Sequence, residues 1–159
     1  MVKVLFVCLG NICRSPMAEA IFRDLVKKEG LEGQIEVDSA GTGDWHIGRP
    51  PHEGTQKILN ENNISFEGMK ARQVISSDLE EFDYIIAMDS DNLRNLERMI
   101  DTEKTGQLKR LLDYVDDRKI TDVPDPYYTG NFDEVYEMVS DGCQRLLDII
   151  KKEKLVVKG

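Results

Sequence analysis

The feature that most constrains this fold is a short apolar segment followed by a compact loop and a helix start. Residues Val4–Val7 are apolar and rich in β-branched and aromatic side chains, which is typical of a strand buried on both faces of a parallel sheet. Further along, Ser15 supplies a hydroxyl that can cap a helix, and Pro16 suits the first helical position. A loop between strand and helix aims backbone N–H groups and the positive end of the helix dipole at one point. The segment therefore predicts an anion-binding site.

The two ends of this loop carry a nucleophile and a cation. Cys8 follows the strand and Arg14 precedes Ser15. A thiol near a helix N-terminus and a fixed cation loses its proton readily, so we expect Cys8 to be a thiolate at neutral pH. Arg14 can hold two phosphate oxygens with its planar guanidinium. Cys8 could instead be a small buried apolar side chain, but the nearby Arg14 and helix start favour nucleophilic catalysis. Gly10 and Asn11 tolerate the left-handed backbone that a tight loop requires.

Strand and helix signals alternate along the rest of the chain. Further strands are predicted at 35–40 and 82–88, and a fourth within 107–115 around Leu111 and Leu112, where a helix is the alternative. Helices are predicted at 15–29, 52–60, 89–100 and 131–150. A further short helix is predicted near the capping box of Ser77 and Glu80. In the helix at 89–100, one side is expected to be lined by Leu93, Leu96 and Ile100. This order predicts an α/β fold with a four-stranded parallel sheet and helices on both faces. We expect residues 1–159 to form one domain, of which 152–159 are a frayed basic tail.

Composition narrows the function classes. The formal net charge of −9 disfavours nucleic acid or an anionic membrane as the main partner. We expect a cytoplasmic protein without membrane insertion, because no signal peptide precedes the first strand and no apolar run is long enough to span a bilayer. Three cysteines in such a chain indicate chemistry rather than a disulfide framework.

Candidate site residues follow the predicted strands. Ligands of parallel sheets bind beyond the carboxyl ends of the strands, so these residues are expected at one rim. Loops 42–51 and 116–130 are long and irregular, and long loops in compact domains are usually functional. The candidates are Cys8, Ser39, Trp45, Asp89 and Asp125.

Two motifs carry a family resemblance. The octapeptide from Cys8 to Ser15 resembles the active-site loop of the low-molecular-weight protein tyrosine phosphatases, and Asp125-Pro126-Tyr127-Tyr128 is similar to their acid loop. The resemblance extends from Val4 to the last helix and implies a flavodoxin-like fold. It implies metal-independent hydrolysis of phosphotyrosine through a phosphocysteine, with no cofactor. The implied partners are phosphotyrosine proteins or peptides, with inorganic phosphate and other oxyanions as competitors, and the chain is expected to be a monomer, with a weak dimer as the alternative.

The resemblance also assigns roles to residues. Cys8 is the expected nucleophile, Arg14 the oxyanion clamp and Asp125 the general acid and base. Pro126 restrains Asp125 to an extended backbone. Asp122, three residues earlier, is the alternative candidate for the acid. Ser15 can donate its hydroxyl to the Cys8 thiolate. The expected phosphate-binding loop consists of Leu9, Gly10, Asn11, Ile12, Cys13, Arg14 and Ser15. The expected pocket walls, which suit a flat aryl group, are Leu9, Ile12, Trp45, Tyr127 and Tyr128.

Several positions add detail. Related enzymes that act on phosphoarginine carry threonine where this chain has Ile12, so Ile12 favours phosphotyrosine. Many family members have a histidine where this chain has Met69. In those relatives the histidine joins residues like Asn11, Ser15 and Ser39 in a hydrogen-bond network that supports the loop. Met69 cannot donate such a bond, so here Asn11 and Ser39 are expected to pair directly. Cys13 could form a reversible disulfide with oxidised Cys8 or could be a packed thiol. Cys143 is expected in the core, and His46 and His52 are expected to be solvated, with no metal site.

Two other functions compete with this interpretation. A thiol-dependent arsenate reductase shares the fold and a similar loop, but it adds a cysteine pair after the third strand, and this chain has no cysteine between Cys13 and Cys143. A non-catalytic phosphate-binding module would need neither the Cys8 thiol nor a remote acid such as Asp125.

Overall fold

Four parallel strands form one sheet in the order β2-β1-β3-β4. They are β1 (Val2–Cys8), β2 (Ile35–Gly41), β3 (Tyr84–Ala87) and β4 (Gln107–Arg110). The structure is a computed structural model that describes residues 1–100, 105–115 and 120–154. The predicted α/β fold is confirmed, as is the parallel four-stranded sheet.

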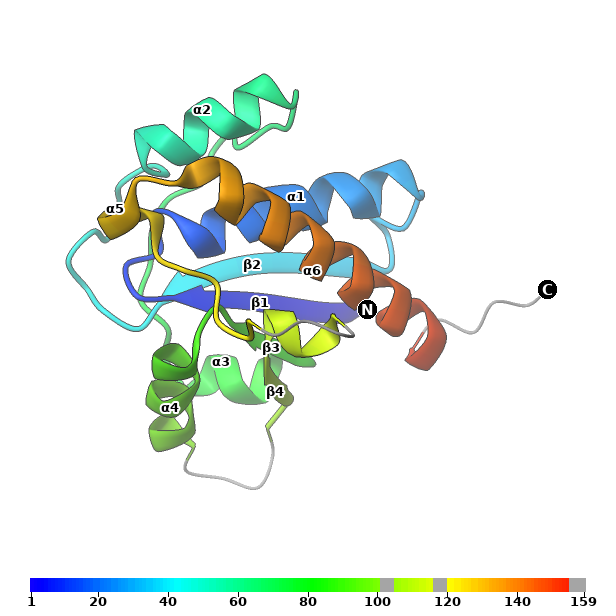
Figure 1. Cartoon of the computed structure of the whole chain (residues 1–159). Helices are drawn as coiled ribbons and strands as arrows, with labels where there is room; N and C mark the ends of the chain where they lie inside the picture. The colour runs from blue at the N-terminus through cyan, green and yellow to red at the C-terminus, as the bar shows by residue number, and fades with distance from the viewer. Residues whose placement is uncertain (101–104, 116–119, 155–159) are drawn as a thin grey trace.

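Helices cover both faces of this sheet (Figure 1). On one face α1 (Arg14–Lys28) packs beside α6 (Phe132–Glu153), with α2 (Glu53–Glu61) next to both. On the other face lie α3 (Ser76–Glu81) and α4 (Ser90–Met99). The short helices η1 (Leu111–Tyr114) and α5 (Pro126–Thr129) lie in the connections before α6. Among the described residues, no helix combines the length and apolarity needed to cross a membrane.

The side chains of β1 point alternately into two hydrophobic clusters, one on each face of the sheet. Val4 and Phe6 belong to the cluster that contains residues of α1 and α6, whereas Leu5 and Val7 belong to the cluster that contains Leu79 of α3 and Leu96 of α4. All four β1 side chains are fully buried. The continuous apolar run of the sequence therefore reflects a strand covered on both faces, as predicted.

The chain changes direction across the sheet next to β1. It passes from β1 to β2 on one side and then to β3 on the other side. This arrangement leaves a crevice beyond the carboxyl ends of β1 and β3, which is where open parallel sheets bind ligands. The loop after β1 and the start of α4 lie at this end of the sheet.

Two predicted helix starts are wrong. Helix α1 begins at Arg14, one residue before the predicted cap, and the residue at its N-cap position, Cys13, makes no side-chain capping bond. Ser15 does not cap the helix because its hydroxyl lies beside the Cys8 sulfur. Helix α3 begins at Ser76, and the carboxylate of Asp78, rather than a Ser77–Glu80 pair, accepts the N–H of Ile75 at 2.8 Å.

The fourth strand is shorter than predicted. It ends at Arg110, and the two leucines expected at its centre, Leu111 and Leu112, lie in η1. Both leucines are buried, and η1 packs against α6. Adjacent residues of a strand point to opposite faces, so leaving the sheet lets both leucines contribute to the same core cluster. The third strand is also shorter than predicted, and Ile100 caps α4 in a half-exposed position instead of lining its buried side.

The predicted start of α6 is confirmed, because the Asn131 side chain accepts the N–H of Glu134 at 3.2 Å. The prediction of a frayed tail from residue 152 is wrong for its first residues. Lys152 and Glu153 are helical, and the Tyr84 hydroxyl donates to Glu153 at 2.8 Å. Residues 155–159 of the predicted tail, and 116–119 of the long loop, lie outside the described residues.

Candidate active site

The loop between β1 and α1 is held by the side chain of Asn11. Asn11 has φ of 55°, the left-handed conformation that the sequence predicted there. Its Nδ2 donates to Ser15 Oγ at 2.8 Å and to Ser39 Oγ at 3.0 Å, and its Oδ1 accepts the backbone N–H of Arg72 at 2.9 Å. The predicted direct bond between Asn11 and Ser39 is confirmed. One buried amide thus ties the loop to β2 and to the segment after Met69.

Sequence reasoning missed Glu19, which extends this network. The Ser39 hydroxyl donates to Glu19 Oε1 at 2.6 Å, and the other Glu19 oxygen is paired with Arg23. Burial raises the pKa of Glu19, and the bonds from Ser39 and Arg23 only partly oppose this rise. Glu19 lies one helical turn after Ser15 on α1, and this spacing was the available signal. Met69 packs against the core and supplies no bond to the network among the described residues.

Cys8 and Arg14 lie at the bottom of the site and are almost completely buried. The Cys8 sulfur is 2.9 Å from Ser15 Oγ. Arg14 Nη1 donates to Asp89 Oδ2 at 2.6 Å and to the carbonyl of Val123 at 2.9 Å. Sequence analysis placed Asp89 at this rim but not as the partner of Arg14.

The remaining edge of the Arg14 guanidinium is nearly free. Nη2 makes one long contact of 3.4 Å to Asp125 Oδ2, and the buried Nε has no hydrogen-bond partner among the described residues. Burial lowers the pKa of Arg14, but Cys8, the bond to Asp89 and the charge of Asp125 outweigh it and leave that pKa raised. Arg14 is therefore a permanent cation whose Nε and Nη2 edge can hold two oxygens of an anion.

Asp125 and Asp122 have different surroundings. Asp125 lines the pocket, its Oδ1 accepts the N–H of Tyr127 at 3.1 Å, and its backbone is extended before Pro126, as predicted. Asp122 instead accepts the N–H and the hydroxyl of Ser90, at 3.0 and 2.8 Å. Of these two carboxylates, only Asp125 lies where a ligand of the pocket can reach it.

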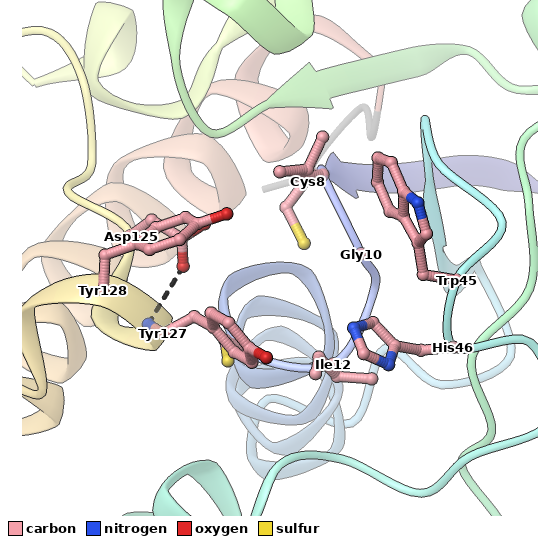
Figure 2. A pocket seen from close by; sticks show the side chains of 10 residues that line it. Cys8, Gly10, Ile12, Trp45, His46, Asp125, Tyr127 and Tyr128 are labelled. Atoms are coloured by element: carbon pink, nitrogen blue, oxygen red, sulfur yellow. Dashed lines mark hydrogen bonds between the residues drawn. The ribbon is translucent and has the colours of Figure 1, made fainter.

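The pocket has a volume of about 320 Å³. Figure 2 shows the Cys8 sulfur between Asp125 and the two tyrosines on one side and Trp45 and His46 on the other. Trp45 lies against Gly43, where any Cβ would collide with the indole ring. The tall aromatic side chains are exposed at the rim, Trp45 at 65%, Tyr127 at 53% and Tyr128 at 75%. The residues that line the pocket are Cys8, Leu9, Gly10, Ile12, Cys13, Trp45, His46, Asp125, Tyr127 and Tyr128.

The prediction that both histidines are solvated is wrong. His46 lines the pocket, and its Nδ1 is buried without a partner among the described residues. The ring of His52 stacks on Phe132 with centroids 5.2 Å apart, and its Nδ1 accepts the N–H of Gly54 at 3.0 Å as the cap of α2. The ring centroids of His46 and His52 lie 6.2 and 5.9 Å from the ring centroid of Tyr127. Only the fold could reveal this, because Tyr127 belongs to α5, which is distant in sequence.

The other two cysteines are buried thiols. Burial, followed by the nearby Cys8 and Asp125 charges, raises the pKa of Cys13 to about 12, so Cys13 is neutral at physiological pH. Its disulfide with Cys8 stays a prediction. Cys143 is fully buried in the main core cluster, as expected, and burial raises its pKa as well. The described part of the chain contains no cluster of three His, Cys, Asp or Glu residues that could hold a metal ion.

Comparisons with known proteins agree over the whole length of the chain. A model of the family described as "Low molecular weight phosphotyrosine protein phosphatase" matches residues 3–156. The chain is 64% identical over 154 residues to "Low molecular weight protein-tyrosine-phosphatase YfkJ" of Bacillus subtilis (strain 168), which covers 97% of this chain and 99% of that protein. It is 51% identical over 159 residues to "Low molecular weight protein-tyrosine-phosphatase PtpA" of Staphylococcus aureus (strain MRSA252), with 100% of both chains covered.

Solved structures give the same picture. The crystal structure of YfkJ from Bacillus subtilis matches with a TM-score of 0.94 and covers 97% of each chain. A structure described as DARP, drosophila arginine phosphatase, matches with a TM-score of 0.89 at 36% identity and covers 96% of this chain and 100% of that chain.

Proposed function

Because the chain belongs to the low molecular weight phosphotyrosine protein phosphatase family, we propose that the pocket at Cys8 cleaves phosphotyrosine through a phosphocysteine intermediate. The protein is a protein-tyrosine phosphatase and thus a phosphoric monoester hydrolase. The observation that carries the proposed mechanism is that Cys8 and Asp125, far apart in the sequence, line one pocket beside the free edge of Arg14.

In the first step, the Cys8 thiolate attacks phosphorus and forms the S–P bond. The bond between phosphorus and the phenol oxygen breaks, and Asp125 gives its proton to that oxygen so that tyrosine leaves as a neutral phenol. Arg14 Nε and Nη2 and the N–H groups of the loop stabilise the charge on the equatorial oxygens. The bonds that Arg14 donates to Asp89 and to the carbonyl of Val123 hold its guanidinium in place before the phosphate arrives.

In the second step, Asp125 takes a proton from water, and the water oxygen attacks the phosphocysteine. The S–P bond breaks, phosphate leaves, and the Cys8 thiolate is restored. The Ser15 hydroxyl, 2.9 Å from the sulfur, can donate a hydrogen bond to the departing thiolate. Asp125 is protonated again and ready for the next substrate.

The walls support selectivity for an aryl phosphate. The phosphate lies deep at Cys8, while Trp45, Tyr127 and Tyr128 rise at the rim, so a phosphotyrosine ring can lie between them and a short phosphoserine cannot reach the sulfur. Ile12 adds an apolar wall, and it is the position where phosphoarginine enzymes resemble this loop but carry threonine. A relative described as an arginine phosphatase shares the fold, which makes phosphoarginine the competing substrate to test.

The decisive experiment measures phosphate release from matched peptides that carry phosphotyrosine, phosphoserine or phosphoarginine, with a metal chelator present. We expect release mainly from phosphotyrosine, and none from Cys8→Ser, which should still bind phosphate. Asp125→Asn should slow release by roughly 100-fold or more, whereas Asp148→Asn, an exposed site on α6, should have no effect. Ile12→Thr should shift the preference toward phosphoarginine. Full activity of Cys8→Ser or Asp125→Asn would overturn the proposed roles.

We also propose a cytoplasmic monomer. The three free cysteines suit a reducing compartment, and the described pocket is complete within a single chain. Size-exclusion chromatography with light scattering should give the mass of one chain.

A further inference from the structure

The segment that carries Asp125 is anchored at its base by a polar cluster outside the pocket. We call residues 120–125 the acid segment. Asp122 Oδ1 accepts both the N–H and the hydroxyl of Ser90, the first residue of α4. Arg110, the last residue of β4, donates from Nη1 to Ser90 Oγ at 2.9 Å and to Thr121 Oγ1 at 3.1 Å, and it lies 3.6 Å from Asp122 Oδ1. Helix α4 and strand β4 therefore meet on this one segment.

The Arg110 side chain is itself fixed in place. Its Nε and Nη2 donate to the two oxygens of Asp113, at 3.2 and 2.9 Å, and Asp113 also accepts the backbone N–H of Arg110 at 3.0 Å. One edge of the guanidinium is thus held by Asp113 at the end of the sheet, and Nη1 is left for the acid segment. Because the guanidinium is planar and bonded along two edges, it fixes both the direction and the distance of the acid segment from β4.

The chain between this cluster and Asp125 transmits the position directly. Val123 is buried, its N–H donates to the carbonyl of Met88 at 2.9 Å, and its carbonyl accepts from Arg14. Pro124 and Pro126 flank Asp125 and restrict its backbone. Asp122 is bonded directly to Val123, and Asp125 follows two residues later, so we expect the position of Asp122 to influence that of the Asp125 carboxyl through this short stretch.

The Asp125 side chain has few bonds that could fix it independently. Its contact to Arg14 is 3.4 Å long, and its second bond, from the N–H of Tyr127, caps the one-turn helix α5. The bond to Arg14 must also loosen when Arg14 holds a phosphate. The position of the carboxyl therefore depends on the backbone of the acid segment rather than on its own contacts.

We propose that Arg110, Ser90 and Asp122 act as a latch that positions the acid segment, so that Asp125 reaches the leaving oxygen of the substrate. Arg110 and Asp122 are positioning residues, since neither lines the pocket. This role rests on the proposed function, in which Asp125 is the general acid. It also explains what Asp122 does, because that carboxylate is not available to the substrate.

The test compares Arg110→Gln and Asp122→Asn with the wild type on a series of aryl phosphates, from an acidic nitrophenol to unsubstituted phenol. The readout is kcat/KM, which reports on formation of the phosphocysteine. A displaced acid matters most for phenols that leave poorly, so we expect a loss of roughly 10-fold for unsubstituted phenol and a much smaller loss for the nitrophenol. Arg110→Lys should lose less activity than Arg110→Gln, because lysine keeps the charge but not the planar guanidinium.

A second arm separates positioning from general damage to the fold. The Arg110→Gln change is repeated in the Asp125→Asn background, where it should have no further effect on kcat/KM because the acid is already absent. Thermal unfolding of each variant should change little, since partly exposed ion pairs contribute little stability. Arg145→Gln, at an exposed pair on α6, is the matched control and should behave as the wild type.

The possible results are distinct. The latch is overturned if Arg110→Gln and Asp122→Asn leave all rates unchanged, lower them equally for every phenol, or lower them further in the Asp125→Asn background. If Asp125→Asn itself loses no more activity with poor leaving groups than with good ones, the proposed function fails, whatever Arg110 does. Selective, non-additive losses in both latch variants support the proposal.

Discussion

At the residue scale, the hydrogen bond between Ser15 and Cys8 should control the second chemical step. A hydrogen bond to a charged group contributes about 1.5–3 kcal/mol, so Ser15→Ala should lower kcat by roughly 10- to 100-fold. The larger part of the loss should fall on breakdown of the phosphocysteine, because the thiolate leaves in that step, whereas the lost Asn11 bond loosens the loop for both steps. Rapid-quench kinetics should show a burst of phenol followed by slow turnover. Ser77→Ala, at an exposed serine of α3, is the control, and an unchanged kcat in Ser15→Ala would contradict the prediction.

Glu19 should make stability depend on pH in the acid range. Its pKa is raised above 4.5 in the folded protein, so the unfolded chain releases this proton first as the pH rises. Between the unfolded and folded pKa values, the unfolded state binds fewer protons, and the free energy of unfolding falls with increasing pH. Glu19→Gln removes this effect. Urea unfolding of both proteins should show the wild type losing stability relative to Glu19→Gln as the pH rises from about 4.5, and a parallel pair of curves would refute it.

The residues that sequence analysis found and missed differ in one physical respect. Cys8, Arg14 and Asp125 lie in short motifs, so their chemistry can be recognised locally. His46, Glu19 and Arg110 instead make contacts with partners that are distant in sequence, namely Tyr127, Ser39 and the acid segment. No local sequence pattern predicts such a contact. The same applies to Asp89, which was predicted at the rim but whose bond to Arg14 depends on the register of β1 and β3.

At the scale of elements, the contact between α6 and η1 depends on a glycine. Gly142 lies inside α6, where alanine would normally favour the helix by about 1 kcal/mol. A Cβ at this position would lie 2.5 Å from Leu111 Cγ, so Leu111 or the helix would have to move. We expect Gly142→Ala to destabilise the protein by about 1–2 kcal/mol in net terms, measured by urea unfolding. Ser140→Ala in the same helix removes a buried hydroxyl that has no partner among the described atoms, so it should be neutral or stabilising. A stabilised Gly142→Ala would contradict this packing argument.

The same contact explains why the sequence predicted the order of elements better than their ends. Periodicity shows which residues are apolar over a whole helix or strand, and it found the buried stripe of α6 and the buried strand β1. Where an element ends depends on what packs against it. Leu111 and Leu112 leave the sheet because α6 offers a surface for both, and that surface is formed by residues later in the chain.

At the scale of the whole molecule, the proposed anion site lies in a protein with a formal net charge of −9. The field of the whole chain should disfavour acidic substrates and favour peptides with basic residues beside the phosphotyrosine. Because the Debye length falls from about 30 Å at 0.01 M salt to about 8 Å at 0.15 M, this preference should be several-fold at low salt and should nearly vanish at physiological salt.

The measurement is kcat/KM for matched phosphotyrosine peptides with lysine or glutamate flanks, over a range of salt concentrations. If the preference comes from the overall charge, the double variant Glu97→Lys/Glu137→Lys, at two exposed acids outside the pocket lining, should weaken it while leaving hydrolysis of a small aryl phosphate nearly unchanged. A preference that persists at high salt and in this variant would come from contacts at the rim instead. The long-range field would then have no part in substrate choice, and the buried Arg14 edge with the loop N–H groups would bind the phosphate independently of the surrounding negative charge.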